Sequence, residues 1–82
     1  MVPRIWYVQS NKGDFARLAR VSAVVRRAND WAAFGGARVS VYLDEPGTPR
    51  RLVGTLTEAM FWGTVNDERL SAAIDRFEIE GR

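Results

Sequence analysis

The stretch from Asp14 to Phe34 constrains the fold most, because it contains neither glycine nor proline and is followed directly by Gly35 and Gly36. Projected at about 100° per residue, its apolar side chains gather on one face. That face comprises Leu18, Val21, Val24, Val25, Ala28, Trp31 and Ala32. The pattern predicts one long amphipathic helix, with Asp14 as its N-cap and Gly35 or Gly36 in the left-handed conformation that ends it.

Two arginines, Arg20 and Arg27, lie on one border of this apolar stripe in the helical projection, beside Val24 and Trp31. Arg17 interrupts the stripe, but in the first turn of the expected helix its long stem could reach water. The stripe indicates a helix that covers a core. Because the planar, weakly hydrated guanidinium suits interfaces, Arg20 and Arg27 are also candidate partner-binding residues.

Residues 3–9 have the composition of a β-strand, since they are dense in β-branched and aromatic side chains. Pro3 stands where a strand can begin. Ile5 and Tyr7 would point one way and Trp6 and Val8 the other, so both faces are apolar. We therefore expect a central strand, or one covered on both faces, and a turn at residues 10–13 that leads into the helix.

Residues 37–57 predict a β-hairpin. Val39, Val41 and Leu43 alternate with polar or amphipathic residues, which indicates one buried and one wetter face. Pro46 and Gly47 suit the central positions of a type II turn, and residues 50–57 form the return strand. A glycine within that return strand, at position 54, predicts a bulge or a close backbone approach.

The remaining residues end in a second helix. Residues 58–65 could extend the preceding strand, form another strand or make a single helical turn, and their aromatic and β-branched content favours strand. Asn66 is the expected N-cap of the helix that follows. Its apolar residues repeat at intervals of three and four: Leu70, Ala73, Ile74 and Phe77.

These elements predict a single small α+β domain over residues 1–78, in the order β-α-β-β-(β)-α, with an antiparallel-rich sheet covered on one face by one long helix. A length of 82 residues is that of one domain. Residues 79–82 spell a clotting-protease recognition sequence that is used to remove tags, so they are either a tag remnant or a native tail. We leave this tail out of the functional interpretation.

The composition excludes several chemistries. The chain has no histidine and no cysteine, which removes Ser-His-Asp and Cys-His nucleophile systems and the usual zinc sites. The acidic pairs at 44–45 and 67–68 are expected in a turn and in a first helical turn, not in a chelate. We therefore predict a non-enzymatic protein with no catalytic residues, no metal and no cofactor. With neither a signal-peptide pattern nor a membrane-length apolar run, we expect a cytoplasmic location.

The candidate binding surface is the sheet face that the helix leaves uncovered. If Val39, Val41 and Leu43 face the helix, Tyr42 and Arg38 face away, as does either Trp6 or Tyr7. Arg50 and Arg51 follow the hairpin turn, and we expect them to cluster with Arg38 at one end of the sheet. The partner-binding candidates are Arg38, Tyr42, Arg50, Arg51, Arg20 and Arg27.

The charge is unevenly spread: residues 1–51 carry nine basic and four acidic side chains, whereas residues 52–82 carry three and six. In size, strand-helix-hairpin order, lack of catalytic residues and uneven charge, the chain resembles small phage-encoded inhibitors such as anti-CRISPR proteins. That resemblance implies a protein-binding inhibitor or regulator, and no residue role carries over from it. The alternative is a nucleic-acid-binding accessory protein that uses an Arg/aromatic sheet face. A homodimer fits either function.

Overall fold

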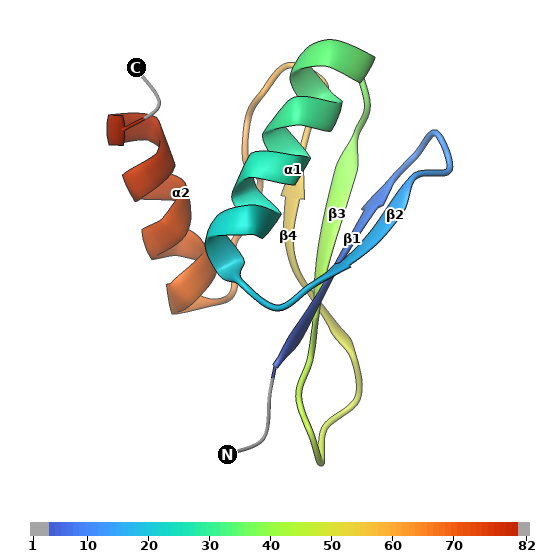
Figure 1. The fold of residues 1–82 in the computed structure, drawn as a ribbon, viewed down its shortest axis with the longest axis vertical. Coiled ribbons are helices and arrows are strands. Elements are labelled where there is room, and N and C mark those ends of the chain that lie inside the picture. The colour runs from blue at the N-terminus through green and yellow to red at the C-terminus, as the bar shows by residue number, and fades with distance from the viewer. Residues whose placement is uncertain (1–3, 81–82) are drawn as a thin grey trace.

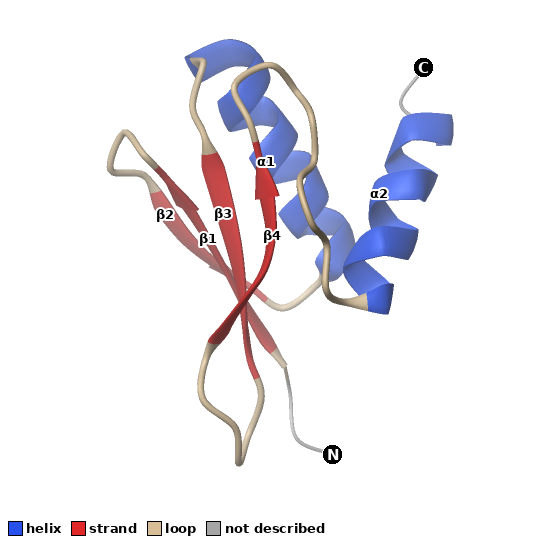
Figure 2. Ribbon diagram, turned by 180° about the vertical axis from the view of Figure 1, so that it is seen from behind, coloured by secondary structure: helices blue, strands red, loops and turns tan. Residues whose placement is uncertain are grey.

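A four-stranded antiparallel sheet with two helices on one side forms the domain (Figures 1 and 2). The computed structural model describes residues 4–80, and Pro3 and the end of the tail lie outside them. The elements are β1 (Ile5–Ser10), β2 (Phe15–Leu18), α1 (Val21–Gly35), β3 (Val39–Asp44), β4 (Arg51–Leu56) and α2 (Glu68–Glu80). The strands lie in the order β2-β1-β3-β4. The α+β class and the central place of β1 are confirmed, and the element order is β-β-α-β-β-α.

The core lies between the sheet and the helices, and it is built from alternate strand residues and one face of each helix. Val39, Val41 and Leu43 are buried, as the alternation in β3 predicts. The buried cluster also includes Trp6, Val8, Val24, Val25, Ala28, Ala32, Val53, Leu56, Leu70 and Ile74. Because Trp6 and Val8 point into this core, the opposite face of β1 carries Tyr7.

The predicted long helix is wrong in its first part, because residues 15–18 form β2 and α1 begins only at Val21. Ala16 and Leu18 point to the core side, opposite Val8 and Trp6 of β1. Phe15 and Arg17 therefore point to the other face. The burial of this segment alternates with a period of two, and pairing with β1 satisfies those of its backbone groups that face β1.

The N-terminus of α1 differs from the prediction, and its C-terminus agrees with it. Asp14 is not its N-cap: the Asp14 amide donates to Ser10 Oγ at 3.1 Å within the β1–β2 turn. Arg20 occupies the N-cap position and makes no side-chain capping bond. The other terminus is as predicted, since Gly36 adopts the left-handed conformation at φ 61° and donates its N–H to the Ala32 carbonyl.

The predicted turn of the β3–β4 hairpin is confirmed, and so are the two alternatives predicted for Gly54, a bulge and a close approach. Gly47 has φ 82°, and the Thr48 amide donates to the Glu45 carbonyl at 3.2 Å, which is the type II arrangement. The register shifts within β4, so that Val53 is the extra residue of a bulge. The Leu70 side chain also approaches the backbone closely at Gly54, because a Cβ there would lie 2.9 Å from Leu70 Cδ2.

The segment between β4 and α2 is neither the favoured strand nor a helical turn. It makes an isolated bridge between Leu56 and Trp62 and then runs along the outer edge of β4. The predicted cap at Asn66 is one residue early. Asp67 Oδ1 accepts from the amides of Arg69 at 2.9 Å and Leu70 at 3.0 Å, so α2 begins after Asp67.

Candidate functional site on the open sheet face

One face of the sheet has no helix over it (Figures 1 and 2). The alternation of the strands directs a mixed set of side chains to this face. We call it the open face and define it by Tyr7, Phe15, Arg17, Tyr42, Arg50 and Leu52. Phe15 and Leu52 are large apolar residues that remain 53% and 49% exposed. A surface of this composition differs from an ordinary polar sheet face, because apolar and aromatic groups are set among cations.

Tyr7 is the centre of the open face. Its side chain is almost fully buried although no helix covers it, because the neighbouring side chains lie over its ring. The guanidinium carbon of Arg50 lies 3.7 Å from the ring centroid, and that of Arg17 lies 5.7 Å from it. The Phe15 ring packs beside Tyr7 at 5.6 Å, tilted by 37°. Cation–π attraction and this packing hold the two arginines in place.

The electrostatics of the open face combine two available cations with one carboxylate. Within residues 4–80, neither Arg17 nor Arg50 has a carboxylate within 4.0 Å. Asp44 Oδ2 lies 3.5 Å from the Tyr7 hydroxyl, at the limit of a hydrogen bond. The arginines are therefore held by an aromatic ring and not by an acid, which leaves their charge available to a partner.

The structure separates the predicted arginine cluster, although Tyr42 and Arg50 do lie on the open face. Arg51 pairs in register with Leu43, so it points to the helix side. There its Nη2 lies 3.6 Å from Glu45 Oε1 and 4.0 Å from Asp67 Oδ2. Consecutive strand residues point to opposite faces, and this is why Arg50 and Arg51 cannot act together.

Arg38 also departs from the predicted cluster, because it precedes β3 whereas Arg50 precedes β4, at the opposite end of the hairpin. Its Nε lies 3.4 Å from Glu58 Oε2. The pKa of Glu58 is lowered, first by a backbone hydrogen bond at Glu58 itself and then by Arg38. Arg38 is thus occupied by an exposed ion pair, of a kind that contributes little to stability.

Arg20 and Arg27 lie on the helix side of the molecule, away from the open face. Arg27 is placed as the projection predicts, with its guanidinium carbon 5.8 Å from the Trp31 ring centroid. Arg20 is exposed at the start of α1. These two residues therefore remain candidates for a separate surface and do not extend the open face.

Sequence reasoning missed Phe15, Arg17 and Leu52 as parts of this face. The helix predicted over residues 14–34 includes Phe15 and Arg17, and consecutive residues of a helix do not alternate between two faces. The signal that could have found them is short: turn residues at 10–13 stand between a run of strand composition, residues 3–9, and residues 15–18, as in a hairpin. Leu52 lies two residues beyond Arg50, on the same side of β4, and could have been assigned by counting.

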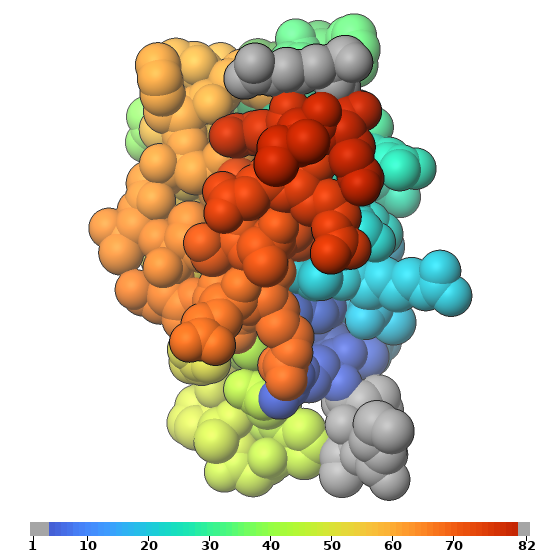
Figure 3. Space-filling view, turned by 90° about the vertical axis from the view of Figure 1, so that its left-hand side faces the viewer, coloured from blue at the N-terminus to red at the C-terminus, as the bar shows by residue number. Residues whose placement is uncertain are grey.

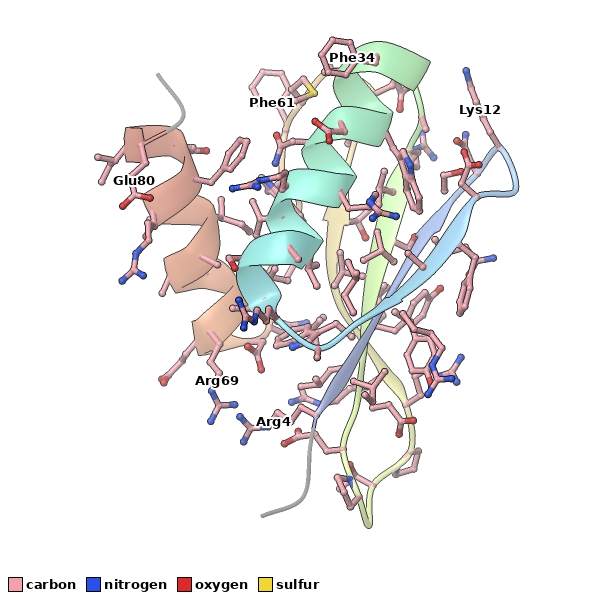
Figure 4. The ribbon with its side chains drawn as sticks, viewed as in Figure 1. Arg4, Lys12, Phe34, Phe61, Arg69 and Glu80 are labelled. Carbon is pink, nitrogen blue, oxygen red and sulfur yellow. The ribbon has the colours of Figure 1, made fainter. Side chains whose placement is uncertain are left out.

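Two further apolar side chains stand outside the open face. Phe34, at the end of α1, is 89% exposed and Phe61, after β4, is 71% exposed. Both project at the end of the molecule where α1 finishes (Figure 4). They provide a second exposed apolar surface against which the open face can be tested.

A groove of about 310 Å³ runs between α1 and α2. Val21, Ala73 and Phe77 supply its apolar part, and Arg26 and Arg76 are among its lining residues. Its polar lining residues are spread along the helices, since Arg69 and Glu80 lie at opposite ends of α2 (Figure 4). We therefore rank it below the open face as a binding site.

Within residues 4–80, no group of three or more acidic side chains is placed to hold a metal ion, and no helix has the length and apolarity of a membrane span. No protein-family model matches the chain, and comparisons with curated proteins and with solved structures give no match either. A function for this chain must therefore come from the geometry of its surfaces.

Proposed function

We propose that this chain is a small non-enzymatic protein-binding module, which inhibits or regulates a partner by occupying its surface with the open face. The observation that carries the proposal is the uncovered arrangement of Phe15, Leu52 and the Arg50–Tyr7–Arg17 stack. Tyrosine and arginine are among the residues that dominate binding energy in protein interfaces. The absence of histidine and cysteine supports a non-enzymatic role.

The chemistry of the stack favours a partner surface that carries carboxylates. Arg50 is held over the Tyr7 ring, so less side-chain entropy is lost when it binds. A carboxylate could accept hydrogen bonds from the free edges of its guanidinium while apolar side chains contact Phe15 and Leu52. Inhibition of the anti-CRISPR kind, which the layout suggested, is one form that such surface occupation could take.

Nucleic-acid binding is the second candidate, because the exposed ring of Phe15 lies on the same face as Arg17 and Arg50. Bases stack on exposed aromatic rings beside cations in many single-strand-binding sheets. We rank it lower for two reasons. Arg50 covers the Tyr7 ring, and Arg38 and Arg51 have acidic neighbours that would compete with phosphates.

The test compares two double variants with the same change of chemistry. Phe15→Glu with Leu52→Glu alters the open face, and Phe34→Glu with Phe61→Glu alters the other exposed apolar residues. Each variant and the wild type are used to capture proteins from a lysate of the host organism, with and without nuclease treatment. We expect a protein that is retained by the wild type and by the control variant but is lost from the open-face variant.

Two results would contradict the proposal. If the control variant loses the partner while the open-face variant keeps it, the binding surface is the end of the molecule that bears Phe34 and Phe61. If every partner disappears on nuclease treatment, nucleic acid is the ligand. A gel shift at physiological salt, abolished by Arg17→Glu with Arg50→Glu, would then establish the second candidate.

A further inference from the structure

The two edges of the sheet are treated differently by the chain. Along β4, the chain covers its own edge: the Gly63 amide donates to the Thr55 carbonyl at 2.8 Å, and the Asn66 amide to the Val53 carbonyl at 2.8 Å. The segment that does this lies beside α2 on one side of the molecule (Figure 3). Along β2, no described segment runs outside the strand (Figures 1 and 2). An uncovered edge is a template for another strand.

The hydrogen-bond pattern fixes which β2 groups point outward. The Ser10 amide donates to the Asp14 carbonyl at 2.9 Å, so this pair is of the hydrogen-bonded type. Antiparallel pairs alternate in type. The Val8–Ala16 pair is then bonded, and the backbone N–H and C=O of Phe15 and Arg17 point away from β1. Within residues 4–80, the inter-element hydrogen bonds leave these four groups without partners.

We propose that β2 pairs with β2 of a second copy of this chain, antiparallel and about a twofold axis at Ala16. In this register Phe15 of each copy lies opposite Arg17 of the other copy. The Phe15 and Arg17 groups that point outward then bond each other in both copies, because residues in a bonded pair exchange both hydrogen bonds. Arg17 also faces an aromatic ring and not the other Arg17, which avoids like charges directly opposite each other.

The side chain at the axis fits this arrangement. Ala16 lies on the core side of β2 and is small, so two copies can approach at a non-bonded pair without a clash. The result is one continuous eight-stranded sheet in which the second copy adds its Phe15 and Arg17 to the open face. Because each edge strand has only four residues, the contact is small and association should be weak, in the micromolar to near-millimolar range.

Sedimentation velocity on the purified chain tests the dimer without any other partner, so its outcome is separate from that of the capture experiment. We expect the average mass to rise with concentration from 9.2 kDa toward twice that value. Arg17→Pro removes an outward N–H from an edge strand, and Arg17→Ala keeps it. We expect the proline variant to weaken association at least about tenfold and the alanine variant by only a few-fold. Circular dichroism checks that both fold.

Cysteine cross-linking tests the register, and the natural chain has no cysteine to interfere. In a non-bonded antiparallel pair the two Cα atoms are about 4.5 Å apart, which is within reach of a disulfide. Ala16→Cys should therefore form a disulfide-linked dimer in a glutathione buffer faster than Asp14→Cys. Asp14 is two positions from the axis, so its two copies would be separated by about 13 Å along the strands. Phe61→Cys measures random collision.

Three results would overturn the proposal. The first is a mass that stays at 9.2 kDa over the whole concentration range. The second is a dimer that Arg17→Pro leaves as stable as Arg17→Ala does. The third is Ala16→Cys cross-linking no faster than Asp14→Cys or Phe61→Cys, which would show that any dimer uses another surface.

Discussion

Replacing Gly54 by alanine should destabilise the domain, because this glycine is where α2 approaches β4. A Cβ at this position lies 2.9 Å from Leu70 Cδ2 and 3.5 Å from Trp62 Cζ3. Cδ2 is the end of a side chain, but Leu70 is fully buried and Trp62 limits where it can move. Overpacking of this kind costs about 1–3 kcal/mol.

A second effect opposes part of that cost. Alanine has less conformational freedom than glycine in the unfolded chain, which stabilises the folded state by about 0.4–1 kcal/mol. We therefore expect Gly54→Ala to lower the free energy of unfolding by about 1–2 kcal/mol, and the midpoint of thermal unfolding by about 4–8 °C for each kcal/mol. Urea titration followed by the fluorescence of the three tryptophans measures the change.

Two comparisons make this result specific. Gly35→Ala is the matched control: nothing lies within 4 Å of a Cβ there, and Gly35 is the last residue of α1. It should be neutral or stabilising by up to about 1 kcal/mol. In a Leu70→Ala background the clash is absent, so Gly54→Ala should there cost nothing. An equal cost of Gly54→Ala in both backgrounds would refute the packing of α2 on this glycine.

Three other outcomes are expected. Asp67→Ala removes the bonds that cap α2 and should cost about 1 kcal/mol in urea titration, whereas Asn66→Ala should cost much less; the reverse order would contradict the cap assignment. The pKa of Glu45 is lowered from its usual 4.5, first by its hydrogen bond from Arg4 at 2.7 Å, so its stabilisation is present above pH 4.5 and is lost as the pH falls through the lower, folded-state pKa. Wild type should thus lose more stability than Glu45→Gln on acidification, and parallel urea midpoints would argue against the pair. Thermal unfolding with a chelator should coincide with unfolding without it, and a fall of several degrees would reveal a metal site.

The hairpin and the face of α2 were predictable because they depend on neighbours in sequence. Alternation in β3 identified Val39, Val41 and Leu43 as buried, and the Pro46-Gly47 pair identified the turn. The same local rules could have corrected the arginine cluster. Consecutive strand residues point to opposite faces, and this alone separates Arg50 from Arg51.

The stretch at residues 15–18 shows where local reasoning stops. In a helical projection Leu18 continues the apolar stripe of α1. In a strand it lies on the same face as Ala16, and Phe15 and Arg17 lie on the other face. Four residues are too few to distinguish a period of 3.6 from a period of two. What decides is the available partner: β1 offers unpaired backbone groups on that side, and α1 retains enough length without these residues.

The sequence by itself determined the class of the domain, the buried faces of β3 and α2, and the absence of histidine and cysteine chemistry, because periodicity and composition act through local geometry and residue type. Only the tertiary structure decided that Tyr7 lies under Arg50 and that Phe15 and Arg17 join the same face. Those contacts depend on the order of strands in the sheet, which brings together residues far apart in the chain. The same order left the β2 edge uncovered, while the chain after β4 bonds back along the edge of that strand.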